Sequence, residues 1–310
     1  RAEFVTQVGQ NVDPPWERAT GNHTAPNAVA MDASGLYRLG AENEGAHWGV
    51  KTDLDGRHLW TNDRWFADPW AQKTLAVTLV GDRLFELMPN GHVYGYDAKS
   101  GRVFTGGDFD PKPWNLRWER FEAPRGASDV ERRNLNAAQS PRDLAGDAAN
   151  DLLLAAFPQH NATAWYSAQD GTLVGTTTNI MNLAGVAVAR DGTIFAIAGG
   201  AVVTWTRKSP IPRTLIAADG LHDPRCLCIS PATGDLFVAG QQVQRFSSAG
   251  KRLAAFGRPE GRGDGVYVPT DFRGITDIEA DPEGGFVVTE GQHSPPRRTA
   301  RFDANGRILR

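Results

Sequence analysis

Short apolar runs alternate with polar, turn-forming segments along most of the chain. The clearest example runs from Asp277 to Arg310, where two apolar runs are followed by the alternating segment RTARFDANGRILR. Runs of four to six apolar residues that are bounded by Gly, Asp or Asn are typical of β-strands. The pairs Asp55-Gly56 and Asn305-Gly306 favour positive φ and therefore predict tight hairpins. This pattern predicts an all-β protein.

The same pattern returns about every 40 to 70 residues, and each copy predicts four short strands. Continuous apolar character in the first two strands of each copy predicts burial on both faces, as between stacked sheets. Such strands include Leu152–Leu154, Ile194–Phe195, Leu236–Val238 and Phe286–Val287. Four-stranded sheets that repeat radially form a β-propeller. We therefore predict one domain over residues 1–310, a six-bladed β-propeller of four-stranded antiparallel blades. Its blades cover about 28–62, 75–105, 143–177, 184–217, 225–257 and 274–310, and residues 3–9 close the last blade as an N-terminal strand.

Three segments resemble the NHL-repeat family of propellers: GVAVARDGTIFAI, DIEADPEGGFVV and HWGVKTDLDGRHLW. The resemblance extends over nearly the whole chain and is strongest in the last three units. It implies the propeller fold and places two kinds of loop on one face of the ring. It does not imply an activity, because the same architecture carries enzymes, receptors and scaffolds.

Composition excludes some classes of partner but does not identify one. The formal net charge of −3 gives no basic field that would attract nucleic acid. No apolar run approaches the ~20 residues that span a bilayer, so we expect no membrane insertion. The chain begins at Arg1 without a signal-like segment, which suggests a processed piece, and we expect an extracytoplasmic or secreted protein. Cys226 and Cys228 have spacing unsuited to a disulfide and are expected to be small buried side chains.

Long connections between the units contain many aromatic residues. Aromatic side chains stack on sugar rings or anchor protein partners, although they also fold down as lids over a core. The longest connection, 106–140, is rich in arginine, and the arginine fork suits a carboxylated ligand unless the loop pairs its own charges. The segment Ser128-Asp129-Val130-Glu131 predicts a helix start there. His160 and His293 lie in loops that depart from the repeat. The predicted ligand-binding residues are Trp16, Trp65, Trp70, Trp114, Trp118, Arg117, Arg120, Tyr267, His160 and His293.

Aligning the units by their turns places Asp143 and Asp277 at the start of first strands, with Asn27 and Asn182 close by. Carboxylates and amides around a channel mouth suit calcium. The arrangement is similar to the metal site of six-bladed lactonase-type propellers, which implies a calcium site formed by Asp143, Asp277, Asn27 and Asn182. The alternative is a channel in which Arg142 and Arg225 neutralise these carboxylates.

Three functions remain open from the sequence. The first is a binding or scaffold propeller that presents an aromatic and charged face to a glycan or a protein. The second is a metal-assisted lyase or hydrolase with its site at the channel mouth. The third is a structural module of a longer extracellular protein. No nucleophile elbow, phosphate loop or His-Glu-x-x-His motif occurs in the sequence, so nucleophilic and nucleotide chemistry have little support.

Overall fold

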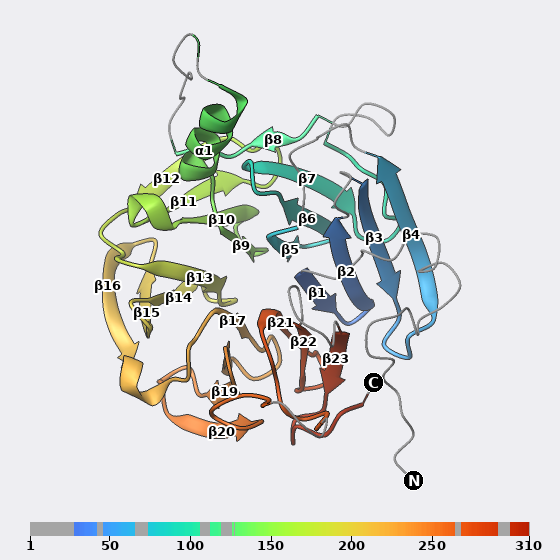
Figure 1. Ribbon diagram of the computed structural model, residues 1–310, viewed down its shortest axis with the longest axis vertical. Helices are drawn as coiled ribbons and strands as arrows, with labels where there is room; N and C mark the ends of the chain where they lie inside the picture. The colour runs from blue at the N-terminus through green and yellow to red at the C-terminus, as the bar shows by residue number, and fades with distance from the viewer. Residues whose placement is uncertain are drawn as a thin grey trace. The chain divides into compact units, whose positions relative to one another are not determined.

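The computed structural model describes residues 28–41, 46–65, 74–105, 112–118, 126, 128–263, 268–290 and 298–309. Strands dominate these residues, which contain a single α-helix and two short 3-10 turns (Figure 1). The described residues contain no helix that is long and apolar enough to cross a membrane. The strands form six antiparallel sheets, and in each sheet consecutive strands are neighbours. The predicted all-β class and six-bladed β-propeller fold are therefore confirmed.

The chain divides into two compact units, residues 1–67 with 221–310 and residues 68–220. The first unit contains the first, fifth and sixth sheets. Their strands are β1 (Ala28–Asp32), β2 (Gly35–Ala41), β3 (Ala46–Thr52) and β4 (His58–Trp65); β17 (Cys226–Ile229), β18 (Leu236–Ala239), β19 (Val243–Phe246) and β20 (Arg252–Phe256); and β21 (Ile275–Ala280), β22 (Phe286–Glu290) and β23 (Arg298–Phe302). Within this unit β21, which begins the sixth sheet, contacts both β1 and β17.

The second unit contains the second, third and fourth sheets. Their strands are β5 (Ala76–Val80), β6 (Arg83–Leu87), β7 (His92–Asp97) and β8 (Trp114–Asn115); β9 (Asp143–Asp147), β10 (Leu152–Phe157), β11 (Ala162–Ser167) and β12 (Leu173–Thr177); and β13 (Leu183–Val188), β14 (Thr193–Ala198), β15 (Ala201–Thr206) and β16 (Ser209–Ile216). Here β9 contacts both β5 and β13. In each unit, then, the first strands of three sheets lie side by side.

Each second strand is buried on both faces, which explains its continuous apolar sequence. Leu153 packs in the core between the second and third sheets, whereas Leu152 and Leu154 pack in the core between the third and fourth. Phe237 and Phe286 contribute to the core between the fifth and sixth sheets. All the second-strand residues predicted to be buried are less than a tenth exposed.

The second sheet differs from its prediction at the fourth strand. The chain was expected to complete this blade by residue 105, but only Val103 forms an isolated bridge there, to Tyr96. The fourth strand is instead β8, where Trp114 and Asn115 pair with Val93 and His92. Phe104 still bonds to β7 through its N–H and the Gly95 carbonyl oxygen (2.9 Å), and its ring covers Gly95 so closely that any side chain at residue 95 would collide with it. Trp65, expected in a loop, is the last residue of β4.

Two other predictions concern the ends of the elements. The helix start at Ser128 is confirmed: helix α1 (Asp129–Gln139) is capped by Ser128 and Glu131, whose side chains and backbone N–H groups bond reciprocally. The closing strand at residues 3–9 lies outside the described residues. The described part of the sixth sheet contains β21–β23 and a bridge from Phe302 to Ile308.

Candidate ligand-binding sites

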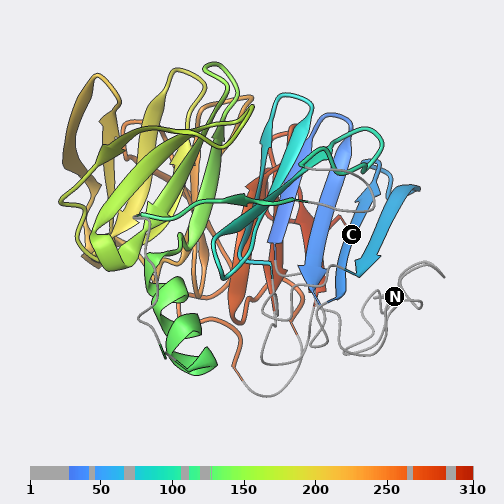
Figure 2. The ribbon, with the colours of Figure 1, turned by 90° about the horizontal axis from the view of Figure 1, so that it is seen from above.

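The segment between the second and third sheets brings together four of the predicted ligand residues, Trp114, Arg117, Trp118 and His160. We call this segment, residues 112–118 and 128–142, the insertion. It includes β8 and α1, and Figure 2 shows α1 beyond the strand ends of its own unit. Trp118 is joined to the end of α1 by a hydrogen bond from its backbone N–H to the Gln139 carbonyl oxygen (3.1 Å).

Both tryptophans of the insertion pack inward. The Trp114 ring lies 5.6 Å from the Phe85 ring and 6.3 Å from the Phe104 ring, between centroids. Trp118 stacks on His160, with centroids 5.2 Å apart and ring planes 14° apart, and it also contacts Phe157. Both rings are partly buried against the core between the second and third sheets. They therefore anchor the insertion to the sheets.

Three polar atoms around Trp118 are buried without a hydrogen-bond partner. They are Arg117 Nε, Gln139 Oε1 and His160 Nε2, and all three residues belong to the described part of the chain. Leaving such atoms unpaired costs free energy, so native proteins contain few of them, and each one calls for an explanation. The insertion is therefore bound to the sheets by apolar contacts and by hydrogen bonds, such as that from the Leu116 N–H to the Gly91 carbonyl oxygen (2.9 Å), while these three polar atoms have no partner.

Asp143 and Asp277, the predicted calcium ligands, both accept hydrogen bonds from backbone N–H groups. Asp143 accepts hydrogen bonds from the N–H groups of Leu144 (2.9 Å) and of Val186 on β13 (2.8 Å). Asp277 accepts the same pair of bonds from Ile278 and from Val29 on β1, both 2.8 Å. Thr78 on β5 plays the matching role toward Gly146 on β9, at 2.8 Å. These side chains connect the first strand of one sheet to that of its neighbour.

The calcium site stays a prediction, and backbone bonding competes with it. Each of the two carboxylates accepts a backbone N–H on both of its oxygens. Asn182 is exposed in a turn with φ of 53°, and Asn27 lies outside the described residues. The Arg225 guanidinium bonds to Asp223 at 2.7 Å. Where the chain is described, no group of three or more His, Cys, Asp or Glu residues is placed to hold a metal ion.

Burial gives two first-strand carboxyl groups unusual acidities. Desolvation raises the pKa of Asp143 to about 7, although the bonds from Val186 and Leu144 oppose the shift. Desolvation likewise raises the pKa of Glu279 on β21 to about 7. Burial also raises the pKa of the neighbouring Cys228 thiol, with the charge of Glu279 adding to the effect. Cys226 and Cys228 are both free, but only Cys228 is buried as predicted, whereas Cys226 is partly exposed.

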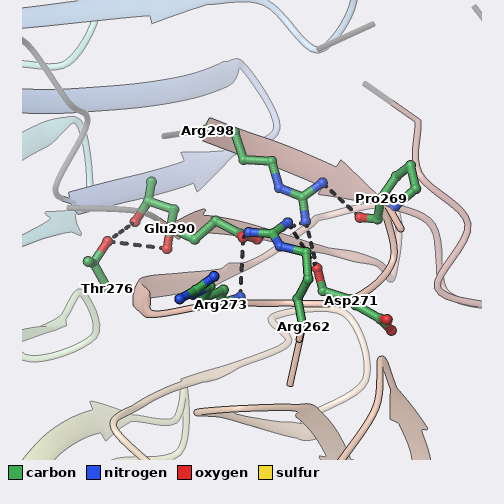
Figure 3. A network of polar contacts seen from close by, with 8 residues as sticks. Arg262, Pro269, Asp271, Arg273, Thr276, Glu290 and Arg298 are labelled. Carbon is green, nitrogen blue, oxygen red and sulfur yellow. Dashed lines mark hydrogen bonds and ion pairs between the residues drawn. The ribbon is translucent and has the colours of Figure 1, made fainter. Parts of the chain in front are cut away.

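A second polar centre, which the sequence did not predict, lies in the first unit (Figure 3). Glu290, at the end of β22, is fully buried between two arginines: Oε1 accepts from Arg262 (2.7 Å) and Oε2 from Arg298 (2.8 Å). The side chains of both arginines are only 5% exposed. The backbone N–H of Arg273 also donates to Glu290 Oε1, at 3.3 Å.

The same arginines hold the loop that precedes β21. Arg298 donates to the carbonyl oxygens of Pro269 (2.7 Å) and Asp271 (3.3 Å), and Arg262 donates to the Asp271 carbonyl at 3.4 Å. The Asp271 carboxylate bonds instead to Arg258, at 2.6 Å. We call Arg258, Arg262, Arg273 and Arg298, with Asp271 and Glu290, the arginine cluster. Its chain segments flank Tyr267 and His293, two predicted ligand residues outside the described part of the chain.

The remaining predicted ligand residues are not placed by the structure. Trp16, Trp70 and Arg120 lie outside the described residues, and only the backbone of Trp65 is described. Of the ten, three lie in the insertion, and a fourth, His160, stacks on one of them, Trp118. Glu290 and Arg298 could have been suspected from sequence only as charges at the ends of apolar strands.

Comparisons with known proteins agree on the fold. No family model matches the chain, and no curated protein matches it. Among solved structures, virginiamycin B lyase from Staphylococcus aureus matches with a TM-score of 0.58 and 12% identity, covering 92% of this chain and 83% of that one. A nidogen/laminin complex matches with a TM-score of 0.59 and 12% identity, over 88% and 91%. The WD40 propeller domain of Doa1 matches with a TM-score of 0.54 and 13% identity, over 88% and 78%. Together with the six sheets, these similarities assign the chain to the β-propeller fold, in agreement with its fold-level resemblance to NHL-type propellers.

Proposed function

We propose that this chain is a binding propeller that recognises a protein partner through the insertion. The proposal rests on one observation: the insertion is packed tightly against the sheets at one end and presents an exposed helix at the other. Trp114 and Trp118 pack against the sheets, while Val130 on α1 is 57% exposed and Glu131 is exposed beside it. Loops that interrupt a rigid repeat are where propellers and other scaffolds carry recognition.

A protein partner is favoured over a glycan because of how the aromatic rings lie. A sugar platform needs an accessible aromatic face, and both described tryptophans of the insertion use their rings for packing. An exposed apolar residue on a capped, charged helix suits a protein surface with an apolar core and a polar rim. The unpaired atoms of Arg117, Gln139 and His160 support the same location.

The test compares Val130→Glu with Leu253→Glu, because Leu253 is a similarly exposed apolar residue, on β20 in the other unit. Crosslinking and affinity capture from an extract of the source cells would identify partners, and calorimetry would measure each purified complex. The proposal expects Val130→Glu to weaken binding of a defined protein at least about tenfold and Leu253→Glu to leave it unchanged. Equal binding of the partner by the wild type, Val130→Glu and Leu253→Glu would overturn the proposal. A glycan-array signal that disappears in Trp118→Ala would support the glycan hypothesis instead.

That this chain is a lyase or a hydrolase stays a prediction from the sequence. The S. aureus lyase shares its fold at 12% identity, which carries no catalytic residue across. Its test is the metal analysis described in the Discussion.

A further inference from the structure

Each fourth strand is the last strand of its sheet, so the backbone groups on one of its sides face no strand of the same sheet. Among the described residues there are five such strands, β4, β8, β12, β16 and β20. An edge of this kind can pair with a strand of another chain, and natural proteins prevent this with prolines, charged side chains or very short edge strands. Four of the five edges have one of these features, and β12 has none.

The four protected edges use different features. β16 contains Pro210 and Pro212, which offer no backbone N–H. β20 begins with the exposed Arg252. β4 contains Asp63 and Arg64, and β8 has only two residues. These edges are therefore poor templates for a further strand.

β12 lies outermost in the third sheet and is open along its length (Figure 1). Its five residues, LVGTT, include no charge and no proline. Leu173 is 55% exposed and Val174 is 50% exposed, and a Cβ placed on Gly175 would meet no atom within 4 Å. Within the part of the chain that the structure describes, the backbone of β12 bonds only to β11. The other side of β12 is therefore an accessible template for a strand.

The pairing of β12 with β11 shifts register between Trp165 and Tyr166. Such bulges also turn an edge away from a partner. However, the pairings of β4, β16 and β20 contain comparable shifts, and each of those strands has prolines or charged residues as well. The shift therefore does not distinguish β12 from the other edges, whereas its lack of prolines and charges does.

We propose that β12 docks against the β12 of a second copy of this chain, with the two strands antiparallel about a two-fold axis. Such a pair needs no second complementary surface, because the same strand serves on both sides. Because β12 has no charged residue, no like charges of this strand face each other across the pair. A register centred on Gly175 sets Val174 opposite Thr176 of the copy and brings together the two glycines, which have no side chains. Val and Thr also favour strands.

A second copy is favoured over an extended peptide from another protein. Edges that capture peptides add pockets for alternate side chains, and these pockets give the specificity. On β12 the side chains of Leu173, Val174 and Thr176 are themselves exposed, which suits pairing with an equally exposed strand. This edge is a different surface from α1, so a failure of the dimer proposal would leave the function proposed for the insertion unaffected.

Sedimentation velocity of the full chain, from about 1 µM to about 1 mM, measures the dimer, because a single strand pair buries less than the ~1,200 Å² of stable interfaces and binds weakly. One test variant combines Val174→Lys with Thr176→Lys, and the other combines Val174→Glu with Thr176→Glu. Each variant alone should dimerise at least about tenfold more weakly than the wild type, since like charges then meet across the pair. An equimolar mixture of the two should dimerise at least as tightly as the wild type, because the charges that meet then have opposite sign.

The matched control is Ile211→Lys on β16. Ile211 is 78% exposed and lies two residues before the exposed Arg213, so this variant also places two positive charges on one edge. The proposal expects its dimerisation to equal that of the wild type, because prolines already protect β16.

Three results would overturn the proposal. The first is a wild type that stays monomeric up to about 1 mM. The second is equal weakening of the dimer by Ile211→Lys and by the variant with lysines on β12. The third is a mixture of the two β12 variants that dimerises no better than either alone. Thermal unfolding shows whether each variant is folded, and Leu173→Lys, a single change at an exposed side chain, replaces the lysine variant if that variant does not fold.

Discussion

Asp143 combines a structural bond with an unusual acidity. It links β9 to β13 through the Val186 N–H, and burial raises its pKa to about 7. The usual value for an aspartic acid, which applies to the unfolded chain, is about 3.9. Between these values the folded protein holds a proton that the unfolded chain releases. The stability contributed by this proton is therefore complete below about pH 4 and is lost as the pH rises through 7.

We therefore expect Asp143→Asn to abolish the part of the pH dependence of stability that comes from this carboxyl group. Raising the pH from 5 to 8 should lower the stability of the wild type relative to this variant by up to about 3 kcal/mol, since the stability falls over the two pH units between 5 and 7 and each unit corresponds to about 1.4 kcal/mol. Calorimetric unfolding at the two pH values measures the difference. Asp170→Asn is the control, because hydrogen bonds from Thr172 lower the pKa of exposed Asp170, which is then ionised in both states throughout this range. An unchanged difference between wild type and Asp143→Asn would contradict the assignment.

Glu290 is the other residue on which much stability depends. Replacing it by Gln leaves Arg262 and Arg298 buried without the carboxylate that joins them. Breaking a buried ion pair from one side costs about 3–5 kcal/mol, and we expect Glu290→Gln to lower the free energy of unfolding by that amount. Urea denaturation measures it.

Glu283→Gln is the matched control for that substitution. Glu283 also bonds an arginine, Arg301, but its side chain is 66% exposed. An exposed pair contributes about 0–1 kcal/mol, so this variant should unfold almost as the wild type does. Similar losses in the two variants would mean that Glu290 is not buried as described.

At the scale of the element, β18 provides the most direct test of the fold. Phe237 is fully buried, and its ring lies 5.6 Å from that of Phe286 on β22. Phe237→Ala leaves a cavity between the fifth and sixth sheets, and such changes cost about 3–5 kcal/mol. Denaturant unfolding measures the loss. A value below about 1 kcal/mol would show that β18 does not pack between these sheets.

Most elements could be predicted because each is encoded locally. Second strands such as Leu152–Phe157 are buried on both faces, which leaves an uninterrupted apolar run in the sequence. The start of α1 is encoded by Ser128 and Glu131 alone. In contrast, β8 could not be predicted, since Trp114 and Asn115 have no strand pattern and pair with β7 only after the chain has left the sheet and returned.

The candidate sites were predicted less completely than the elements, for a related reason. Aromatic residues in long connections identified the insertion, but not that Trp118 would stack on His160, 42 residues further along the chain. The arginine cluster went unnoticed because its members come from separate segments: Arg262 and Glu290 are 28 residues apart. Asp143 and Asp277 were found by their repeat positions, but their backbone bonds depend on the neighbouring sheet.

At the scale of the whole molecule, a chelator shows whether Asp143 and Asp277 bind calcium or only backbone N–H groups. A bound calcium ion would stabilise the folded state, so removing it would lower the melting temperature. Backbone bonding predicts no change, and this is the result we expect, because the carboxylate oxygens already accept backbone N–H groups. Differential scanning calorimetry with and without EDTA, together with metal analysis of the purified protein, makes the measurement. A fall of several degrees would support the metal site and, with it, the enzyme hypothesis.

The bonds made by Thr78, Asp143 and Asp277 also decide where such a chain can be cut and recombined. A single sheet could be chosen as the unit to exchange between propellers. However, Val186, on the first strand of the fourth sheet, donates its backbone N–H to Asp143, which belongs to the third sheet. Grafting the fourth sheet into another propeller would leave the Val186 N–H without a hydrogen-bond acceptor unless the host offers one at the same place. A crossover just before Asp143 keeps this acceptor in the same fragment as Val186, but it separates Gly146 from Thr78, so the host must offer an acceptor for the Gly146 N–H.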